Sequence, residues 1–222
     1  MNDYEAKEHY KDIDIAQQYD AQYEAPLSLS NMMSKFYGWR EAQAFRRLLR
    51  HVPKGGKVLD VACGTGRYTR QLLDHGCKVG GVDISDEMLK FAHRAIKDNP
   101  NLLFLQKGDA EKLPFDDNEF DGVTCIRLYQ RVPPVQRLEM LREVKRVSKS
   151  WAILLFAMSN PWLKIRQRIR RELIHGRDTA PNTVTLAEMC EELATAGLKL
   201  EERTWIIPAI TTGMIVRVDC DS

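Results

Sequence analysis

Short apolar runs alternate with amphipathic stretches through the middle of the chain. Five runs are rich in Val, Leu, Ile and Phe and are short enough to be buried strands: residues 57–62, 78–82, 102–107, 120–126 and 151–158. Between them, residues 65–75, 85–96 and 135–147 carry apolar side chains at helical spacing. Strands that alternate with helices, and that read as apolar throughout, predict a parallel doubly wound sheet.

The two ends of the chain follow other patterns. A helix is expected to open near Trp39 and to end before Pro53, because Phe45, Leu48 and Leu49 share one helical face. Residues 185–196 predict a further helix, followed by strands at 198–207 and 214–218. The connection between these two strands is too short for a parallel crossover, so they must pair antiparallel. The expected fold is α/β, a Rossmann-like seven-stranded mixed sheet.

The composition indicates one globular domain spanning 1–222. The chain has 222 residues, of which 44% are hydrophobic and 29% are charged. Within it we expect an N-terminal helical cap (1–52), a cofactor-binding core (53–158), a helical lid inserted after the fifth strand (159–183) and the C-terminal helix and hairpin (184–222). The cap is acidic at its start, since residues 1–30 hold seven acids and two bases.

Several classes of protein are disfavoured by what the chain lacks. Its longest apolar run is eight residues, well short of the roughly 20 that span a bilayer. The N-terminus has no basic start followed by an apolar stretch, so no secretory signal is predicted. The five cysteines show no disulfide or metal-ligand spacing, so we expect a cytoplasmic protein without a metal site. A net charge of +2 does not suggest DNA binding.

A glycine-containing loop follows the first expected strand. Gly64 and Gly66 lie between that strand and a helix, a place where the backbone can approach a ligand closely. A bare GxG could equally be a tight turn. However, acids also follow the second and third strands, at Asp83 and Asp109, and the carboxyl ends of such strands hold ligands in doubly wound sheets.

Two nucleotide ligands compete for this loop. A dinucleotide fold prefers a third glycine at the position that Thr69 occupies here. Asp60, just before the loop, would repel a pyrophosphate but would attract an ammonium or sulfonium group. The pattern therefore favours S-adenosylmethionine over NAD.

Four segments, in order, resemble the motifs of class I S-adenosylmethionine-dependent methyltransferases of the type 11-like, small-molecule branch. They are VLDVACGTG, VDIS, GDAEKLPFDDNEFD and LREVKRVS, and the resemblance covers roughly residues 55–160. It implies that S-adenosyl-L-methionine is bound and S-adenosyl-L-homocysteine is released. It implies that Gly64 and Gly66 shape the loop under the methionine part of the cofactor. It also implies that Asp60 and the backbone of Ala62 and Cys63 lie near the amino group of that methionine part.

The resemblance also implies residues for the rest of the cofactor. Asp83 would bind the ribose hydroxyls, and Ile84 and Met88 would pack on the adenine. Asp109 and the Ala110 N–H would bind the edge of the adenine. The backbone that ends at Arg127 would line the cleft below the sulfonium, and Tyr19 would fold over the cofactor from the cap.

The chain departs from this family after the fourth strand. Relatives commonly carry histidines where residues 128–132 here read LYQRV, so a histidine base is not expected. Tyr129 is the one nearby candidate for a catalytic, proton-handling group, and a purely packing role for it is equally compatible. Proximity and alignment of the acceptor would then supply most of the rate.

A basic amphipathic segment at residues 161–177 is the second departure. It holds six bases and one acid, with Trp162, Ile165, Ile169 and Leu173 at helical spacing. It could be a substrate-site lid, a surface for anionic lipid or an acidic partner through residues 162–177, or an RNA-contacting face. His175 beside it is a weak candidate for substrate contact.

The function expected from these features is in-line methyl transfer to a small acceptor, lipid-like or anionic. The alternatives are a methyltransferase for tRNA or protein that uses residues 162–177, and a non-enzymatic sensor that binds the cofactor. Neither the acceptor nor the oligomeric state follows from the sequence.

Overall fold

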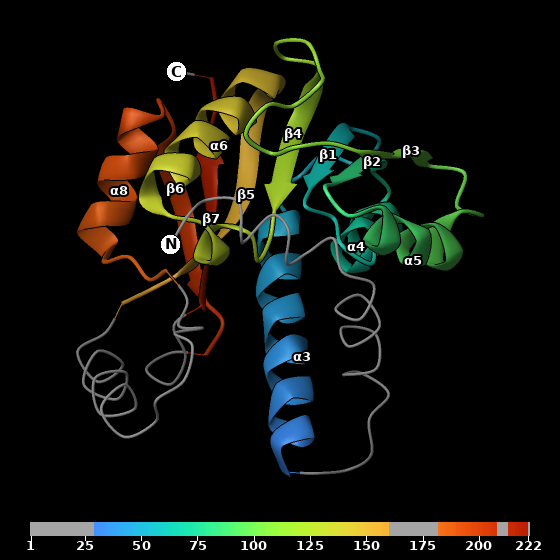
Figure 1. Ribbon diagram of the computed structural model, residues 1–222, viewed down its shortest axis with the longest axis horizontal. Coiled ribbons are helices and arrows are strands. Elements are labelled where there is room, and N and C mark those ends of the chain that lie inside the picture. The colour runs from blue at the N-terminus through green and yellow to red at the C-terminus, as the bar shows by residue number, and fades with distance from the viewer. Residues whose placement is uncertain (1–28, 160–181, 208–212, 222) are drawn as a thin grey trace.

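A single seven-stranded sheet forms the centre of the computed structural model, which describes residues 29–159, 182–207 and 213–221 (Figure 1). The strand order is β3-β2-β1-β4-β5-β7-β6. The strands are β1 (Lys57–Val61), β2 (Lys78–Asp83), β3 (Leu102–Lys107), β4 (Phe120–Cys125), β5 (Ser148–Ala157), β6 (Lys199–Trp205) and β7 (Gly213–Asp219). β1 to β5 run parallel, and β7 pairs antiparallel with both β5 and β6. The predicted mixed α/β sheet is therefore confirmed.

Helices cover both faces of this sheet. They are α3 (Leu29–Leu49), α4 (Arg67–His75), α5 (Asp86–Ile96), the 3-10 turn η1 (Tyr129–Arg131), α6 (Pro134–Val147) and α8 (Leu186–Thr195). Apolar residues of α6 and α8 pack on one face of the sheet in one buried cluster. Residues of α3, α4 and α5 pack on the other face in a second cluster. This three-layer arrangement leaves the carboxyl ends of the parallel strands at one edge.

Local capping explains where several of these helices begin and end. Ser85 caps α5, since its hydroxyl oxygen accepts a hydrogen bond from the Met88 N–H at 3.3 Å. Thr185 and Glu188 form a reciprocal capping box at the start of α8. Gly76 ends α4 in the left-handed conformation, with φ of 99°. These local contacts set the boundaries of α4, α5 and α8.

Two elements begin earlier than their sequence pattern predicted. α3 opens at Leu29 rather than near Trp39, because its first turns expose Met32 and Phe36 instead of presenting a buried stripe. β5 opens at Ser148 rather than at Trp151, and the Ser148 hydroxyl donates to the Trp151 carbonyl at 2.8 Å. In both places the side chains show no helix or strand periodicity, although the backbone forms a regular element.

Several predicted features fall outside the described residues. Residues 1–28 of the expected cap and residues 160–181 of the expected lid are among them. Within the described part of the chain, no helix combines the length and the apolar character needed to cross a bilayer. The division into cap, core, lid and C-terminal hairpin remains a prediction.

Candidate functional site

A pocket opens at the carboxyl ends of β1, β2 and β4, where the sequence placed the ligand. It brings together nine of the twelve residues expected to hold the cofactor: Ala62, Cys63, Gly64, Asp83, Ile84, Met88, Asp109, Ala110 and Arg127. Leu128, Val132 and Met140 add an apolar wall on the β4 and α6 side. The roles of these residues toward a ligand remain predictions.

The loop after β1 has an unusual backbone. Ala62, Gly64 and Gly66 all have positive φ, at 55°, 55° and 83°. A Cβ placed on Gly64 would meet no atom within 4 Å, so this glycine faces open space in the pocket. The loop therefore forms a cradle that a side chain at position 64 would fill.

Gly66 has a structural role beside the pocket rather than on its lining. It is the N-cap of α4, and a Cβ there would lie 3.2 Å from the Cβ of Ala92 in α5. Its left-handed φ and this close approach allow α4 to pack against α5. Gly66 thus shapes the loop, as expected, without lining the pocket.

Asp83 connects the loop to the end of β2. Its Oδ2 accepts from the Gly64 N–H at 2.8 Å, and its Oδ1 accepts from the Ser85 N–H at 2.9 Å. The side chain lines the pocket although little of it is exposed. Burial raises the pKa of this carboxyl, while the backbone hydrogen bonds act in the opposite direction. The carboxylate is therefore oriented in advance at the edge of the pocket.

Asp109 occupies the matching position after β3. Its Oδ1 accepts from the Glu111 N–H at 3.0 Å, which closes a turn around Ala110. All three residues line the pocket. Together with Asp83, they make this side of the pocket acidic and rich in hydrogen-bonding groups.

Asp60 lies beneath the loop rather than on the pocket wall. Only 2% of it is exposed, and its two oxygens accept from the hydroxyls of Thr69 at 2.6 Å and Thr124 at 2.7 Å. The expectation that this carboxylate meets the amino group of the cofactor therefore gains no support from its position. These two hydrogen bonds link α4 and β4 to β1. Thr69, which the sequence showed only as a missing glycine, is one of the partners of Asp60.

Burial raises the pKa of Asp60 to about 6, against the lowering effect of the two threonine hydroxyls. Between about pH 4 and pH 6 the folded state therefore holds a proton that the unfolded state has released. Stability contributed by this proton is lost as the pH rises through that window.

An Asp60→Asn variant should not lose stability in this pH window, because the asparagine side chain does not titrate. Its free energy of unfolding relative to wild type is expected to rise by about 2–3 kcal/mol between pH 4 and pH 7.5. Urea unfolding of both proteins at the two pH values measures the change. The exposed Asp98→Asn variant is the control. A difference between Asp60→Asn and wild type that stays constant with pH would contradict the assignment.

A buried polar network that sequence reasoning missed supports one wall of the pocket. Glu41 of α3 is 1% exposed and accepts from Arg127 Nε at 2.7 Å and from the Tyr68 hydroxyl. The Arg67 guanidinium donates to the Gly38 carbonyl of the same helix. Arg67, Tyr68 and Arg127 all line the pocket. α3 therefore holds the side chains that form this wall.

A signal for this network was present in the sequence. Glu41 precedes Phe45 and Leu48 by four and seven residues, so it shares their helical face. Both of these residues are fully buried, and a carboxylate on that face needs a partner. The identity of the partners depends on long-range packing, which the spacing does not reveal.

The charges around the pocket are divided between two sides. Asp83 ends β2, and Asp109 and Glu111 follow β3. Arg67 begins α4, and Arg127 and Arg131 lie in the segment after β4. Arg127 also has a positive φ of 68°. One side is therefore acidic, and the other carries arginines, of which Arg127 is paired with Glu41.

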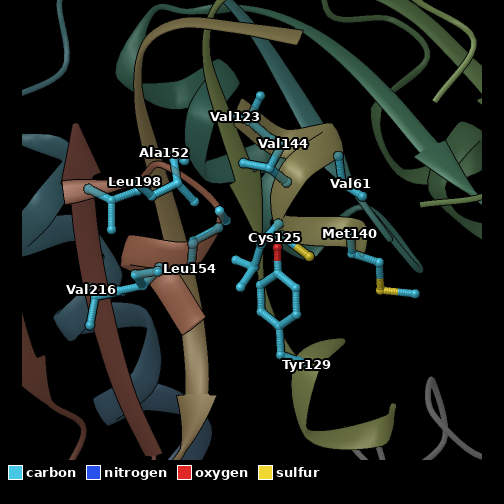
Figure 2. Close-up of a cluster of buried hydrophobic side chains, with 14 of the residues drawn as sticks. Val61, Val123, Cys125, Tyr129, Met140, Val144, Ala152, Leu154, Leu198 and Val216 are labelled. Atoms are coloured by element: carbon cyan, nitrogen blue, oxygen red, sulfur yellow. The ribbon is translucent and has the colours of Figure 1, made fainter. Parts of the chain in front are cut away.

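Tyr129 is part of the hydrophobic core and is not among the residues that line the pocket. Its ring is 1% exposed, stacks on Phe156 with 5.2 Å between the ring centroids, and belongs to the cluster under α6. Figure 2 shows its hydroxyl directed at Cys125, between Met140 and Leu154. This residue does not line the pocket, so its position supports the packing role and not the proton-handling one.

Cys63 lines the pocket with a thiol that is neutral at physiological pH. Burial, and then the neighbouring charges of Asp60 and Asp83, raise the pKa of its thiol well above the usual value. It therefore contributes a neutral, apolar surface to the loop. Tyr19 and His175, two further candidates, lie outside the described residues.

Comparison with known proteins agrees with this geometry. Residues 58–150 match a family described as a methyltransferase domain. The chain is 41% identical over 108 residues to the demethylmenaquinone methyltransferase of Staphylococcus saprophyticus, covering 47% of this chain and 45% of that protein. It is 44% identical over 105 residues to the enzyme of that name from Symbiobacterium thermophilum, covering 45% and 41%. It thus spans less than half the length of these relatives.

The whole fold also matches a solved structure. Magnesium protoporphyrin IX methyltransferase from Synechocystis, solved with bound S-adenosylhomocysteine, superposes with a TM-score of 0.80 and 16% identity. The superposition covers 98% of this chain and 99% of that one. At this identity the likeness establishes the fold alone. Residues 58–150 therefore match the methyltransferase domain family in sequence, and the chain has the fold of a solved methyltransferase.

Proposed function

We propose that this protein is an S-adenosylmethionine-dependent methyltransferase that acts on a small acceptor. The observation that carries the proposal is the link between the left-handed loop after β1 and the Asp83 carboxylate, both on the wall of one pocket. The relatives whose names specify a small-molecule methyltransferase support the same class of activity.

The residues present suit this cofactor. Gly64 leaves room where the methionine part would pass over the loop, and Asp83 would bind the ribose hydroxyls. Ile84 and Met88 would cover the adenine, with Asp109 at its edge. When bound, S-adenosylmethionine supplies an activated methyl group on a sulfonium. The protein then has to hold the acceptor in line with that methyl group and exclude water.

The basic side of the pocket favours an acceptor that carries negative charge. Arg67 and Arg131 line it beside the apolar side chains of Leu128 and Val132, whereas the charge of Arg127 is balanced by Glu41. None of the described residues that line the pocket is a histidine. An acceptor that is already ionised near neutral pH needs no base to become a nucleophile. An anionic acceptor with an apolar body therefore fits this wall best.

Thermal unfolding with separate ligands tests the proposal. S-adenosylmethionine or S-adenosylhomocysteine at about 100 times its Kd should stabilise the protein by about 2.7 kcal/mol, a shift of roughly 5–11 °C. NAD at the same concentration should give no shift. A shift with NAD alone would reassign the pocket to a dinucleotide. A shift with the first two ligands but no methylated product from any acceptor pool would support a sensor.

A further inference from the structure

Exposed apolar side chains gather on the first half of α3. Four of the eight large hydrophobic residues exposed in the described part of the chain lie there: Met32 (54% exposed), Met33 (61%), Phe36 (49%) and Trp39 (52%). The rings of Phe36 and Trp39 stack with 6.0 Å between their centroids. A cluster of this size on one helix marks an interaction surface rather than scattered exposure.

These residues continue into a basic stripe along the same face. Positions 32, 36, 39, 43, 46 and 50 advance by four and three residues, so they follow one line along the helix and just past its end. The line begins with Met32, Phe36 and Trp39 and ends with Arg46 and Arg50, both exposed. We call this line the outer stripe of α3. Its first half is apolar and its second half is cationic.

The opposite face of α3 fixes the helix to the protein. Phe45 and Leu48 are fully buried against the sheet, and Glu41 binds Arg127 and Tyr68. Figure 1 shows the first half of α3 extending past the edge of the sheet, away from α4 and α5. The anchored half therefore presents the apolar half at the periphery of the molecule.

We propose that the outer stripe of α3 docks on an anionic phospholipid surface. Methionine and aromatic side chains insert at the boundary between headgroups and acyl chains, while arginines bind the phosphates. The charge of α3 is complementary to such a surface. It carries Lys35, Arg40, Arg46 and Arg47, of which Arg47 pairs with Glu202 at 3.8 Å, and its one acid, Glu41, is buried and paired. Lys35 is exposed beside the apolar residues, where a long cationic side chain can extend toward the headgroups.

Docking in this way would bring the pocket close to the lipid. Gly38 and Glu41 contact Arg67 and Arg127, so the pocket wall lies within one helical turn of Trp39 along α3, on the opposite side of the helix. Such a position would suit an acceptor with an apolar body. Binding to the lipid surface itself requires neither the cofactor nor the proposed methyl transfer.

Cosedimentation with vesicles tests the proposal on the full chain. One set of vesicles holds equal parts of phosphatidylglycerol and phosphatidylcholine, and the other holds phosphatidylcholine alone. Wild type should bind the anionic set at least about tenfold more tightly. Phe36→Ser/Trp39→Ser should weaken that binding by about tenfold or more through lost apolar burial. Arg46→Gln/Arg50→Gln should weaken it similarly and reduce its dependence on salt.

A matched control removes exposed apolar residues from other elements. Leu103→Ser/Val135→Ser changes β3 and α6, where both side chains are exposed, and should bind vesicles as wild type does. Each variant is also checked by thermal unfolding and by S-adenosylhomocysteine affinity. Loss of vesicle binding with both properties intact supports the proposal whether or not methyl transfer is ever observed.

Four outcomes would overturn it. They are no binding of wild type to either vesicle, equal binding to both vesicles, full binding by the two α3 variants, and loss of binding in the control variant. A dimer of wild type that the Phe36→Ser/Trp39→Ser change abolishes, without vesicle binding, would instead assign the stripe to a second copy of the chain.

Discussion

Replacing Asp83 with alanine is expected to weaken S-adenosylhomocysteine binding by about 100-fold or more. Each hydrogen bond to a charged carboxylate contributes about 1.5–3 kcal/mol, and the ribose would offer two hydroxyls. The same substitution removes the acceptor of the Gly64 N–H, so the loop loses its link to β2. Isothermal titration of the non-reactive product measures the affinity without any knowledge of the acceptor.

Two further variants make this result specific. Asp83→Asn retains a side-chain oxygen for the loop and should lose less affinity than Asp83→Ala. Asp86→Ala removes the next acid along the chain, which is exposed and paired with Lys107, and should leave the affinity unchanged. Binding by Asp83→Ala within about threefold of wild type would refute the assignment of the site.

Replacing Glu41 with alanine should strongly lower the free energy of unfolding. The change leaves the Arg127 guanidinium and the Tyr68 hydroxyl without their carboxylate partner inside the protein. Removing one member of a buried ion pair costs about 3–5 kcal/mol, and the partial exposure of Arg127 places the effect at the low end. A loss of about 3 kcal/mol corresponds to a fall in Tm of roughly 6–12 °C.

Differential scanning calorimetry of three variants tests this expectation. Glu41→Gln keeps an oxygen acceptor and should lose less stability than Glu41→Ala. Gln43→Ala, on the exposed side of the same helix, should change Tm by no more than about 2 °C. Equal Tm values for the Glu41→Ala and Gln43→Ala variants would contradict this expectation. Cofactor affinity should also fall in Glu41→Ala, because Tyr68 and Arg127 line the pocket.

The sheet could be predicted from the sequence because its signals are local. Each parallel strand is a short apolar run, and Gly76, Ser85 and Thr185 mark helix ends through their own backbone or side-chain geometry. The short connection before β7 forces antiparallel pairing. The early starts of α3 and β5 were missed because neither the exposed methionines of α3 nor the polar residues 148–150 follow an apolar pattern.

The candidate site could be predicted only as far as it follows the strand ends. Asp83 and Asp109 are placed by the sheet itself, so their common edge was foreseeable. The wall made by Arg67, Tyr68 and Arg127 depends on Glu41, which is 27 residues from Tyr68 and 86 from Arg127. Asp60 also has partners that its motif did not reveal, since its two oxygens accept from the hydroxyls of Thr69 and Thr124.

The distribution of the thiols has a consequence for chemical labelling. Cys63, Cys77, Cys125 and Cys220 are buried, and burial raises the pKa of each one. Since the thiolate is the form that reacts with alkylating reagents, these four should resist them at neutral pH. Cys190 on α8 is exposed. A maleimide dye should therefore attach at one position on α8, away from both the pocket and the outer stripe, without any cysteine having to be replaced.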